Sequence, residues 1–326
     1  MKAIVYTKYG SPNVLEYLDL DKPTPKANEV LIRIRATSLN SWDWDLLRGK
    51  PFIVRLVGGG ISKPKKKIIG CDVAGQIESV GRNVSRFKAG DEVFGDLSAG
   101  NWGGLAEYVC ASENALVVKP PLLSFEQAAA IPQAGVMALQ GIRDYGQVKS
   151  GQKVLINGAG GGVGTFAIQL AKYYRAEVTA VDSSIKLEMM QSLGADHVID
   201  YAQEDFTRNG HQYDFILDVV GHHSIYDYKR ALNSEGIYRM IGGPTKLIFQ
   251  SIFIAPFLSM NSNKKMGILT HEPNKGLDFI LELFNSGMVN PVVDKIFPLS
   301  ETAAAMQYLG DGLSLGKVVI TQENLG

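Results

Sequence analysis

The strongest chemical signal in the sequence is a glycine-rich turn that connects an apolar strand to a helix. Residues 154–156 are Val-Leu-Ile, and residues 157–164 read Asn-Gly-Ala-Gly-Gly-Gly-Val-Gly. Glycines let the backbone approach a pyrophosphate closely, and a helix N-terminus supplies free N–H groups and a positive dipole end. We therefore expect the turn to bind the phosphates of a dinucleotide through Gly158, Gly160, Gly161, Gly162, Val163 and Gly164.

The spacing of these glycines is Gly158-x-x-Gly161-x-x-Gly164 and not a strict G-x-G-x-x-G. A glycine cluster alone also fits a loop that binds no ligand. This cluster follows a buried strand and opens a helix within a strand–helix–strand unit, and that context favours a dinucleotide site.

The choice between nicotinamide cofactors depends on Asp182, which closes the second apolar strand at 178–181. A carboxylate there accepts hydrogen bonds from the ribose hydroxyls of NAD and repels the 2′-phosphate of NADP. Ser183 and Lys186 follow at once and suit a phosphate. Lys186 also lies four positions after Asp182, a helical spacing at which the two charges neutralise each other. These residues leave both NADH and NADPH open.

Two kinds of pattern divide the chain into the elements that must position these residues. Within 29–36, apolar and polar residues alternate with the period of two of a half-buried strand, and glycines punctuate the apolar runs that follow. This region is typical of a compact barrel-like domain. From residue 153 onward, strands and helices alternate, which predicts a parallel sheet covered on both faces. The expected strands are 154–156, 178–181, 197–199, 215–217 and 236–241, and helices are expected at 163–174 and 185–193.

The remaining elements lie outside this alternation. Ser124 and Gln127 read as a capping box that opens a helix. The last 55 or so residues hold two amphipathic patterns, near 275–286 and 301–309, and a final strand at 317–320.

Composition limits the function classes. The 326 residues include 33 basic and 33 acidic side chains, so charge favours neither nucleic acid nor an anionic membrane as a partner. Cys71 and Cys110 are the two cysteines; they make no disulfide framework and fit a reducing compartment. Residues 1–6 look like a strand and not a signal peptide, and the apolar stretch 247–260 is too short and too interrupted to span a bilayer. We expect a cytoplasmic protein.

Short blocks along the whole chain resemble the medium-chain dehydrogenase/reductase superfamily, and within it the zinc-free quinone oxidoreductase-like branch. Each block is modest alone, but their order and spacing are specific. Besides the glycine turn, the blocks are LNSWD (39–43), GCDVAG (70–75), GDEVFG (90–95), GGLAEY (103–108), LGAD (193–196), DVVG (218–221) and GKVV (316–319).

The resemblance implies an α/β fold in which a Rossmann doubly wound parallel-sheet domain is inserted into a GroES-like β-barrel catalytic domain. The catalytic domain would comprise residues 1–124 and 271–326, and the NAD(P)-binding domain residues 125–270. The active site would lie in the cleft between them. The resemblance also implies a homodimer. If the apolar run 247–254 is exposed on one subunit, it offers an apolar surface for association with a second. Burial of that run within one subunit is the alternative.

The presence of a zinc site can be judged at the three positions where zinc-dependent relatives carry Cys, His and Cys as ligands. The resemblance places Asn40, Cys71 and Gln133 there. One thiol and two amides do not make a zinc site. Two cysteines also cannot build the four-cysteine structural site of those relatives, so we expect no metal. We interpret Cys71 as a buried residue and not a nucleophile, because no histidine partner is visible.

The resemblance points to Asn40 and Asp43 as the catalytic residues near the nicotinamide, where Asn40 would hydrogen-bond a substrate carbonyl or the carboxamide. The alternative is that both only cap the turn after the third strand. Many relatives carry a tyrosine two residues beyond this aspartate; here the position is Asp45, which puts a tyrosine proton donor in doubt. Lys186 and Tyr201 are fifteen positions apart, as are the Lys and Tyr that clasp the 2′-phosphate in NADPH-using relatives, so we favour NADPH over NADH. The other implied cofactor contacts are Val220, Gly242 and Lys317.

Without zinc, no residue polarises an alcoholate strongly. That favours hydride transfer to an acceptor that is already electrophilic, namely a small-molecule quinone or α,β-unsaturated carbonyl. Two other functions stay open. One is a nicotinamide-nucleotide-binding protein with a structural or regulatory role, which an NAD(P)H turnover assay separates from an enzyme. The other is a zinc alcohol dehydrogenase, which elemental analysis would reveal.

Overall fold

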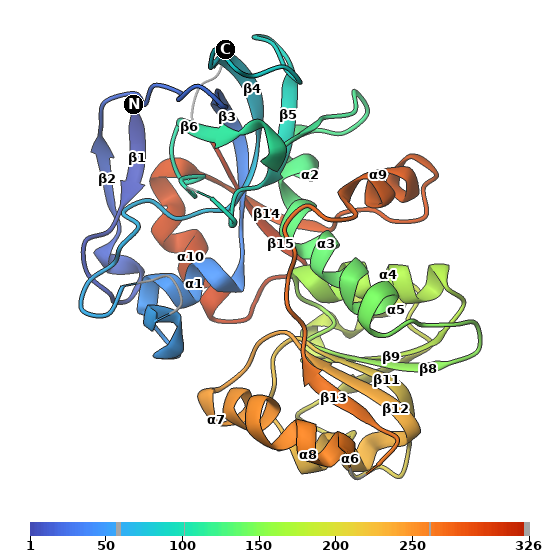
Figure 1. Cartoon of the computed structure of the whole chain (residues 1–326). Coiled ribbons are helices and arrows are strands. Elements are labelled where there is room, and N and C mark those ends of the chain that lie inside the picture. The colour runs from blue at the N-terminus through green and yellow to red at the C-terminus, as the bar shows by residue number, and fades with distance from the viewer. Residues whose placement is uncertain (57–59, 101, 261, 323–326) are drawn as a thin grey trace. The chain divides into compact units, whose positions relative to one another are not determined.

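The chain packs as two compact units, seen in a computed structural model that describes residues 1–56, 60–100, 102–260 and 262–322 (Figure 1). Unit 1 comprises Met1–Ala134, Pro273–Lys275 and Pro291–Gly326, and unit 2 comprises Gly135–Glu272 and Gly276–Asn290. Among the described residues, no helix has the length and apolar character that crossing a membrane requires.

Unit 1 is built on a seven-stranded sheet in the order β14-β15-β3-β4-β5-β7, with β6 paired to β3. All neighbours in this sheet are antiparallel except β14 and β15, and β1 and β2 form a separate antiparallel pair. The strands are β1 (Lys2–Val5), β2 (Glu16–Asp19), β3 (Glu29–Leu39), β4 (Asp72–Val80), β5 (Glu92–Asp96), β6 (Tyr108–Ser112), β7 (Val117–Val118), β14 (Val293–Pro298) and β15 (Lys317–Thr321); the helices are α1 (Ser41–Arg48), α2 (Phe125–Ala130) and α10 (Thr302–Gly310).

Strand β3 organises this unit. Its predicted alternation is confirmed, because Val30, Ile32 and Ile34 are fully buried in one core with Val73 and Val93. At the far end of β3, Leu39 pairs with Val318 of β15, and Ser38 pairs with Asp72 of β4. The end of β3 and the beginnings of β4 and β15 therefore meet at one end of the sheet.

Unit 2 contains a six-stranded sheet in the order β10-β9-β8-β11-β12-β13, in which every neighbouring pair is parallel. Numbered along the chain, this is the 3-2-1-4-5-6 order of a Rossmann sheet, so the predicted doubly wound domain is confirmed. The strands are β8 (Lys153–Asn157), β9 (Glu177–Asp182), β10 (His197–Asp200), β11 (Tyr213–Asp218), β12 (Leu232–Met240) and β13 (Lys265–Ile268).

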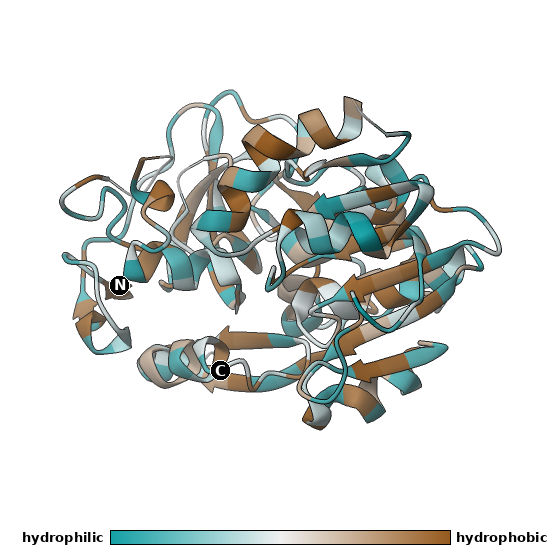
Figure 2. Cartoon of the chain, turned by 90° about the horizontal axis from the view of Figure 1, so that it is seen from below, coloured by the Kyte–Doolittle hydropathy of each residue, from teal (hydrophilic) through white to brown (hydrophobic). Residues whose placement is uncertain are grey.

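Helices cover both faces of this sheet, with α4 and α5 on one face and α6, α7 and α8 on the other (Figure 1). Figure 2 shows why: the strands are largely hydrophobic, while many helices carry a hydrophobic and a hydrophilic side. The helices are α4 (Gly162–Tyr173), α5 (Leu187–Ser192), α6 (Ile225–Ala231), α7 (Thr245–Phe249), α8 (Ala255–Met260) and α9 (Leu277–Asn285); the chain enters the unit through α3 (Pro132–Leu139) and a π-helical turn at Gln140–Tyr145.

The two units divide the chain at positions other than the expected 124/125 and 270/271. The capping box of Ser124 and Gln127 is present, but the helix that it opens, α2, packs on β3 and β4 and so belongs to unit 1. Helix α9 belongs to unit 2, where Phe279 lies under the guanidinium of Arg143. A periodic pattern predicts a helix, but it does not say which sheet the helix covers.

The sequence expectations for unit 2 did not include helix α6, strand β13 or the helical stretch from α7 to α8. Strand β13 adds an edge strand beside β12. The apolar stretch 247–260, to which the sequence analysis assigned no secondary structure, is helical. Helix α7 continues through a π-helical turn at Gln250–Ile254 into α8.

Candidate active site

The glycine turn lies where it was predicted, between β8 and α4. Gly158 has a φ of 83°, in the left-handed region that favours glycine. A β-carbon on Gly164 would lie 2.4 Å from the Ala159 Cα and from the Gly158 carbonyl oxygen, so only glycine lets the helix pack this closely on the turn. A β-carbon on Gly161 would lie 3.6 Å from the Gly158 oxygen, an ordinary contact. Gly164 thus serves the fold, whereas Gly161 leaves room for a ligand.

The N-terminus of α4 is suited to an anion. Gly161 is the N-cap and provides no side-chain cap, and the first turn contains no acidic residue. The N–H groups of a first helical turn have no acceptor within the helix. Gly162 and Val163 are partly exposed in this turn, and N–H groups of this kind suit an anion.

The loop after β11 touches the glycine turn. A β-carbon on Gly158 would lie 2.8 Å from a methyl group of Val220, and one on Gly242, after β12, would lie 3.1 Å from the Val219 carbonyl oxygen. β8 and β11 are neighbours in the sheet although they are first and fourth in the chain, which makes this the topological switch point where such sheets bind ligands. The structure therefore brings Val220 and Gly242 to the glycine turn.

Asp218 fixes these loops and was not singled out as a site residue from the sequence. Its Oδ1 accepts hydrogen bonds from Asn157 Nδ2 at 2.8 Å and from the Gly221 N–H at 2.9 Å, and its Oδ2 accepts one from the Tyr238 hydroxyl at 2.8 Å. Burial raises the pKa of this carboxyl. The signals in the sequence were its position at the end of a strand of the alternating pattern and its place at the start of the block DVVG (218–221).

Asp182 does not present a free carboxylate at the end of β9. Its Oδ2 accepts the Gly160 N–H at 2.9 Å, and its Oδ1 accepts the Ser183 N–H at 2.8 Å. Lys186 Nζ lies 3.3 Å from the same Oδ1, and both side chains are buried. The neutralising pair expected from the four-residue spacing is confirmed. Asp182 therefore holds the glycine turn in place as well as lying near the expected ribose position.

Tyr201 and Ser183 lie at the same strand end. The Tyr201 N–H donates to the Asp182 carbonyl oxygen at 3.2 Å, and the Tyr201 side chain is 56% exposed. Its ring lies beside that of His222, with 6.3 Å between the centroids. The residues expected to choose the cofactor are thus gathered around Asp182.

In unit 1, Asn40 joins a buried polar cluster. Its Oδ1 accepts a hydrogen bond from Lys317 Nζ at 2.5 Å, and its Nδ2 donates to Asp72 Oδ2 at 2.9 Å and weakly to Cys71 Sγ at 3.5 Å. These residues stand at the end of β3 and the beginnings of β4 and β15, where the strand register brings them together.

Lys317 was expected to contact the cofactor, but its side chain is 1% exposed and faces Asn40 and Asp72, with 3.4 Å between Nζ and Asp72 Oδ2. The block that carries it indicates a strand but not the direction in which the lysine points.

Asp43 has a structural task at the start of α1. Its Oδ2 accepts the Asn40 N–H and its Oδ1 accepts the Gly70 N–H, both at 2.9 Å. Burial raises the pKa of this carboxyl to about 7. Asp43 thus caps the helix, which was the alternative considered for it, and ties α1 to the segment before β4. The side chain of Asn40 does more than cap, because it points into the buried cluster.

The three positions compared with zinc ligands do come together. Gln133 Nε2 donates to Cys71 Sγ at 3.1 Å, and Asn40 Nδ2 approaches the same sulfur. Burial raises the pKa of the Cys71 thiol, with Asp96 and Asp72 adding to the effect. Cys71, Asp72 and Asp96 also place donor atoms within 4.8 Å of one another. However, Oδ1 of Asp72 accepts a hydrogen bond from the Gln133 N–H, and Oδ2 accepts hydrogen bonds from Ser38, Asn40 and Lys317. Because both oxygens are already engaged in these contacts, this set does not fit a zinc ion.

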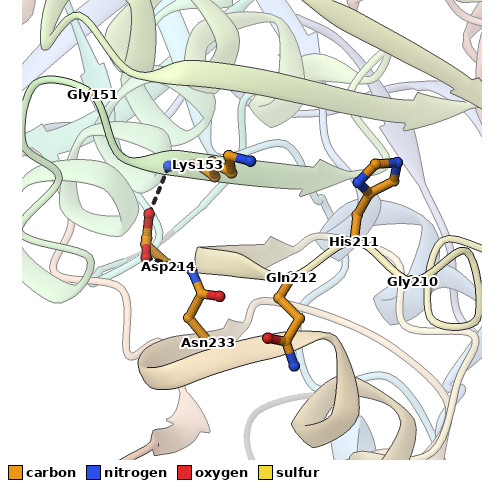
Figure 3. Close-up of a pocket in the computed structure, with 7 residues that line it drawn as sticks. All are labelled: Gly151, Lys153, Gly210, His211, Gln212, Asp214 and Asn233. Atoms are coloured by element: carbon orange, nitrogen blue, oxygen red, sulfur yellow. Dashed lines mark hydrogen bonds between the residues drawn. The ribbon is translucent and has the colours of Figure 1, made fainter.

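A surface hollow of about 360 Å3 lies elsewhere in unit 2 (Figure 3). Its lining includes Lys153 at the start of β8 and Asp214 near the start of β11, with the Lys153 N–H donating to Asp214 Oδ2. This is the amino end of the parallel strands, opposite the end at which Rossmann sheets bind their ligands. The hollow therefore lies at the opposite end of the sheet from the glycine turn.

Comparison with known proteins agrees with this geometry. Two family models match, an alcohol dehydrogenase GroES-like domain over residues 26–121 and a zinc-binding dehydrogenase over residues 193–320. The chain is 33% identical to the chloroplast envelope quinone oxidoreductase homolog of Arabidopsis thaliana, with 98% of each chain covered. It is also 33% identical to the NADPH-dependent alkenal/one oxidoreductase of the same plant, over 98% of this chain and 79% of the relative.

A solved structure extends the agreement to the fold. The quinone oxidoreductase of Coxiella burnetii superposes with a TM-score of 0.87 at 30% identity, over 99% of both chains. The first unit is thus a GroES-like domain and the second a Rossmann-type domain. The chain belongs to the medium-chain dehydrogenase/reductase superfamily, in its quinone oxidoreductase-like branch.

Proposed function

We propose that this protein transfers a hydride from NADPH to a quinone or an α,β-unsaturated carbonyl compound, and that it does so without zinc. The observation that carries the proposal is the glycine turn at the switch point between β8 and β11, with an uncapped helix N-terminus and room at Gly161. Bound there, the reduced nicotinamide would supply the hydride.

The donor set around Cys71 supports zinc independence. Both amide groups direct N–H bonds at the sulfur, and an N–H donor has no lone pair to offer a metal. The nearby carboxylate of Asp72 is already held by hydrogen bonds and by Lys317. A zinc ion would have to break these contacts to obtain its usual four ligands.

The acceptor class follows from the same cluster. In the absence of a Lewis acid, an acceptor must already be electrophilic, as quinones and conjugated carbonyls are. Asn40 offers an amide N–H to a carbonyl oxygen, and an ordered donor of that kind stabilises the charge that develops on the oxygen as hydride arrives. The relatives named for quinones and for alkenals and alkenones support this class.

The residues around Asp182 favour NADPH. A lone carboxylate would repel the 2′-phosphate, but Lys186 lies 3.3 Å from Asp182 and reduces that repulsion. Ser183 and the exposed Tyr201 hydroxyl offer hydrogen bonds to phosphate oxygens. The relative named as NADPH-dependent supports the same choice. NADH remains the second candidate, because Asp182 also suits a free ribose hydroxyl.

The decisive test measures enzymatic turnover with pure protein whose zinc content has been determined. NADPH and NADH oxidation would be followed with a panel of quinones, enals and enones, and with ketones as the control class. We expect NADPH-dependent reduction of the electrophilic acceptors, unaffected by chelator. In Lys186→Ala, KM for NADPH should rise while KM for NADH changes little. Tight cofactor binding without turnover would point to the regulatory alternative, and one zinc per chain that is needed for activity would contradict the metal-free mechanism.

A further inference from the structure

Lys317 and Asp72 determine which way the carboxamide of Asn40 points. An ammonium only donates hydrogen bonds and an ionised carboxylate only accepts them. Lys317 Nζ lies 2.5 Å from one end of the amide and Asp72 Oδ2 lies 2.9 Å from the other. Turning the amide over would set its NH2 group against the ammonium and its oxygen against the carboxylate. Both contacts would become repulsive, so the present orientation is strongly preferred.

The frame that holds these two charges is drawn from several elements. Asp72, at the start of β4, accepts the Ser38 hydroxyl of β3 at 2.9 Å and the Gln133 N–H of α3 at 2.9 Å. Lys317, at the start of β15, is 1% exposed, and Asp72 is fully buried. A buried ion pair contributes little net stability, because desolvation offsets most of the attraction. Its defined effect here is geometric, since it fixes the groups on both sides of Asn40.

This orientation leaves one N–H of Asn40 for a ligand. Of the two hydrogens on Nδ2, one is used by Asp72, and the other has only the Cys71 sulfur at 3.5 Å, a weak acceptor. A carbonyl oxygen is a stronger acceptor than a thiol sulfur. A carbonyl group that reached this N–H would therefore meet Asn40 as a hydrogen-bond donor, because the oxygen of Asn40 is occupied by Lys317.

We infer that Lys317 is a positioning residue, and not a cofactor ligand, whose ammonium fixes Asn40 as an oriented N–H donor toward the carbonyl group of the acceptor. This inference rests on the proposed hydride transfer for its catalytic consequence. Its structural part, a single orientation of the Asn40 amide set by Lys317 and Asp72, is independent of that function.

The test removes both charges together, because Lys317→Met alone would leave Asp72 buried without its partner. In Lys317→Met/Asp72→Asn, position 72 keeps a hydrogen-bonding amide and the polarity that orients Asn40 is lost. We expect kcat to fall by about tenfold or more, since misplaced groups commonly lose this much. The dissociation constant of NADPH, measured by fluorescence without acceptor, should stay within about twofold, well below one factor of ten in binding.

A matched control is available in the same unit. Lys119 is a buried lysine whose Nζ lies 3.0 Å from Glu92, away from the Asn40 contacts. Lys119→Met/Glu92→Gln should therefore keep the kcat of the wild type.

A second readout does not depend on activity. It is the side-chain NH2 signal of Asn40 in a proton–nitrogen-15 NMR correlation spectrum of the apo protein, assigned by its loss in Asn40→Asp. It should broaden or move in the Lys317 double variant and remain in the control.

The outcomes separate the two proposals. If the Lys317 double variant keeps wild-type kcat, or if NADPH binding weakens while kcat is unchanged, the positioning role is wrong, and the second result would restore Lys317 as a cofactor contact. An unchanged Asn40 signal in that variant also contradicts the inference. If the wild type reduces no acceptor, the proposed function fails, while the NMR comparison still decides whether Lys317 orients Asn40.

Discussion

Asp43 illustrates how a single buried side chain can serve the scaffold of an active site. Each of its carboxylate oxygens accepts one backbone N–H, from Asn40 and from Gly70. Charge on such a group is opposed by burial and by the neighbouring Asp72, and its pKa is raised to about 7. The family resemblance made Asp43 a catalytic candidate in the sequence, and its contacts hold the backbone on which Asn40 stands.

The raised pKa of Asp43 predicts a pH dependence of stability. The unfolded side chain loses its proton near pH 3.9, whereas the folded one keeps it to about pH 7. Between these values the unfolded state binds fewer protons, so the free energy of unfolding falls as pH rises. The full effect is at most about 4 kcal/mol. In urea titrations from pH 5 to 8, the wild type should lose stability more steeply than Asp43→Asn.

The control for this comparison is Asp278→Asn, at an exposed position in α9. That variant should follow the pH dependence of the wild type. If Asp43→Asn and the wild type show parallel curves over this range, Asp43 does not titrate near pH 7 in the folded protein and the raised pKa is wrong.

At the scale of elements, the glycine turn combines two different requirements for glycine. Gly164 is needed because the first turn of α4 packs directly on Ala159, whereas Gly161 meets only an ordinary contact. The sequence spacing alone does not separate the two, because each is simply one glycine of a cluster. The structure therefore turns one motif into two testable positions.

We predict that Gly161→Val weakens NADPH binding by about tenfold or more, because the valine side chain would collide with the pyrophosphate. One factor of ten corresponds to about 1.4 kcal/mol of binding free energy. The thermal stability of this variant should change little. Gly164→Ala should instead lower the melting temperature, because its β-carbon would lie 2.4 Å from two backbone atoms. Fluorescence titration with NADPH and thermal unfolding of both variants check the pair. Wild-type NADPH affinity in a folded Gly161→Val would show that the phosphates bind elsewhere.

The elements themselves were largely predictable, and their partners were not. Strands such as β3 and β8 follow from short-range periodicity, which the sequence displays directly. In the cluster of Asn40, Asp72 and Lys317, the lysine contacts residues 245 and 277 positions away, and Asn40 contacts Asp72, which is 32 positions away. No local pattern encodes these contacts. The members of the cluster were named singly, from family blocks, and the sequence did not indicate that Lys317 contacts Asn40 and Asp72. Strand β13 was missed because its sequence, Lys-Met-Gly-Ile, carries too weak an apolar pattern to indicate a strand.

At the scale of the whole molecule, the notable surface is an apolar ridge on α7, the following π-helical turn and α8. The ridge consists of Phe249, Ile252, Phe253, Phe257 and Met260, which are between 42% and 81% exposed, and the rings of Phe249 and Phe253 stack on each other. The same run buries Leu247, Ser251 and Ala255 against the sheet. The alternative that the whole run is buried within one subunit is therefore wrong for these outer side chains. A contiguous exposed apolar ridge on a folded domain is typical of an interaction surface.

We predict that this ridge lies in the interface of a homodimer. Burying several aromatic and aliphatic side chains against a second copy removes apolar surface from water, which is the main favourable contribution to association. Light scattering at micromolar concentration should give twice the chain mass. Phe253→Lys/Phe257→Lys should give the single-chain mass, since two charges would then need to be desolvated. Leu122→Lys, an equally drastic change at an 82% exposed leucine of unit 1, should leave the mass doubled. A wild type that already scatters as a single chain would exclude the dimer, and a doubled mass that survives the phenylalanine substitutions would place its interface on another surface.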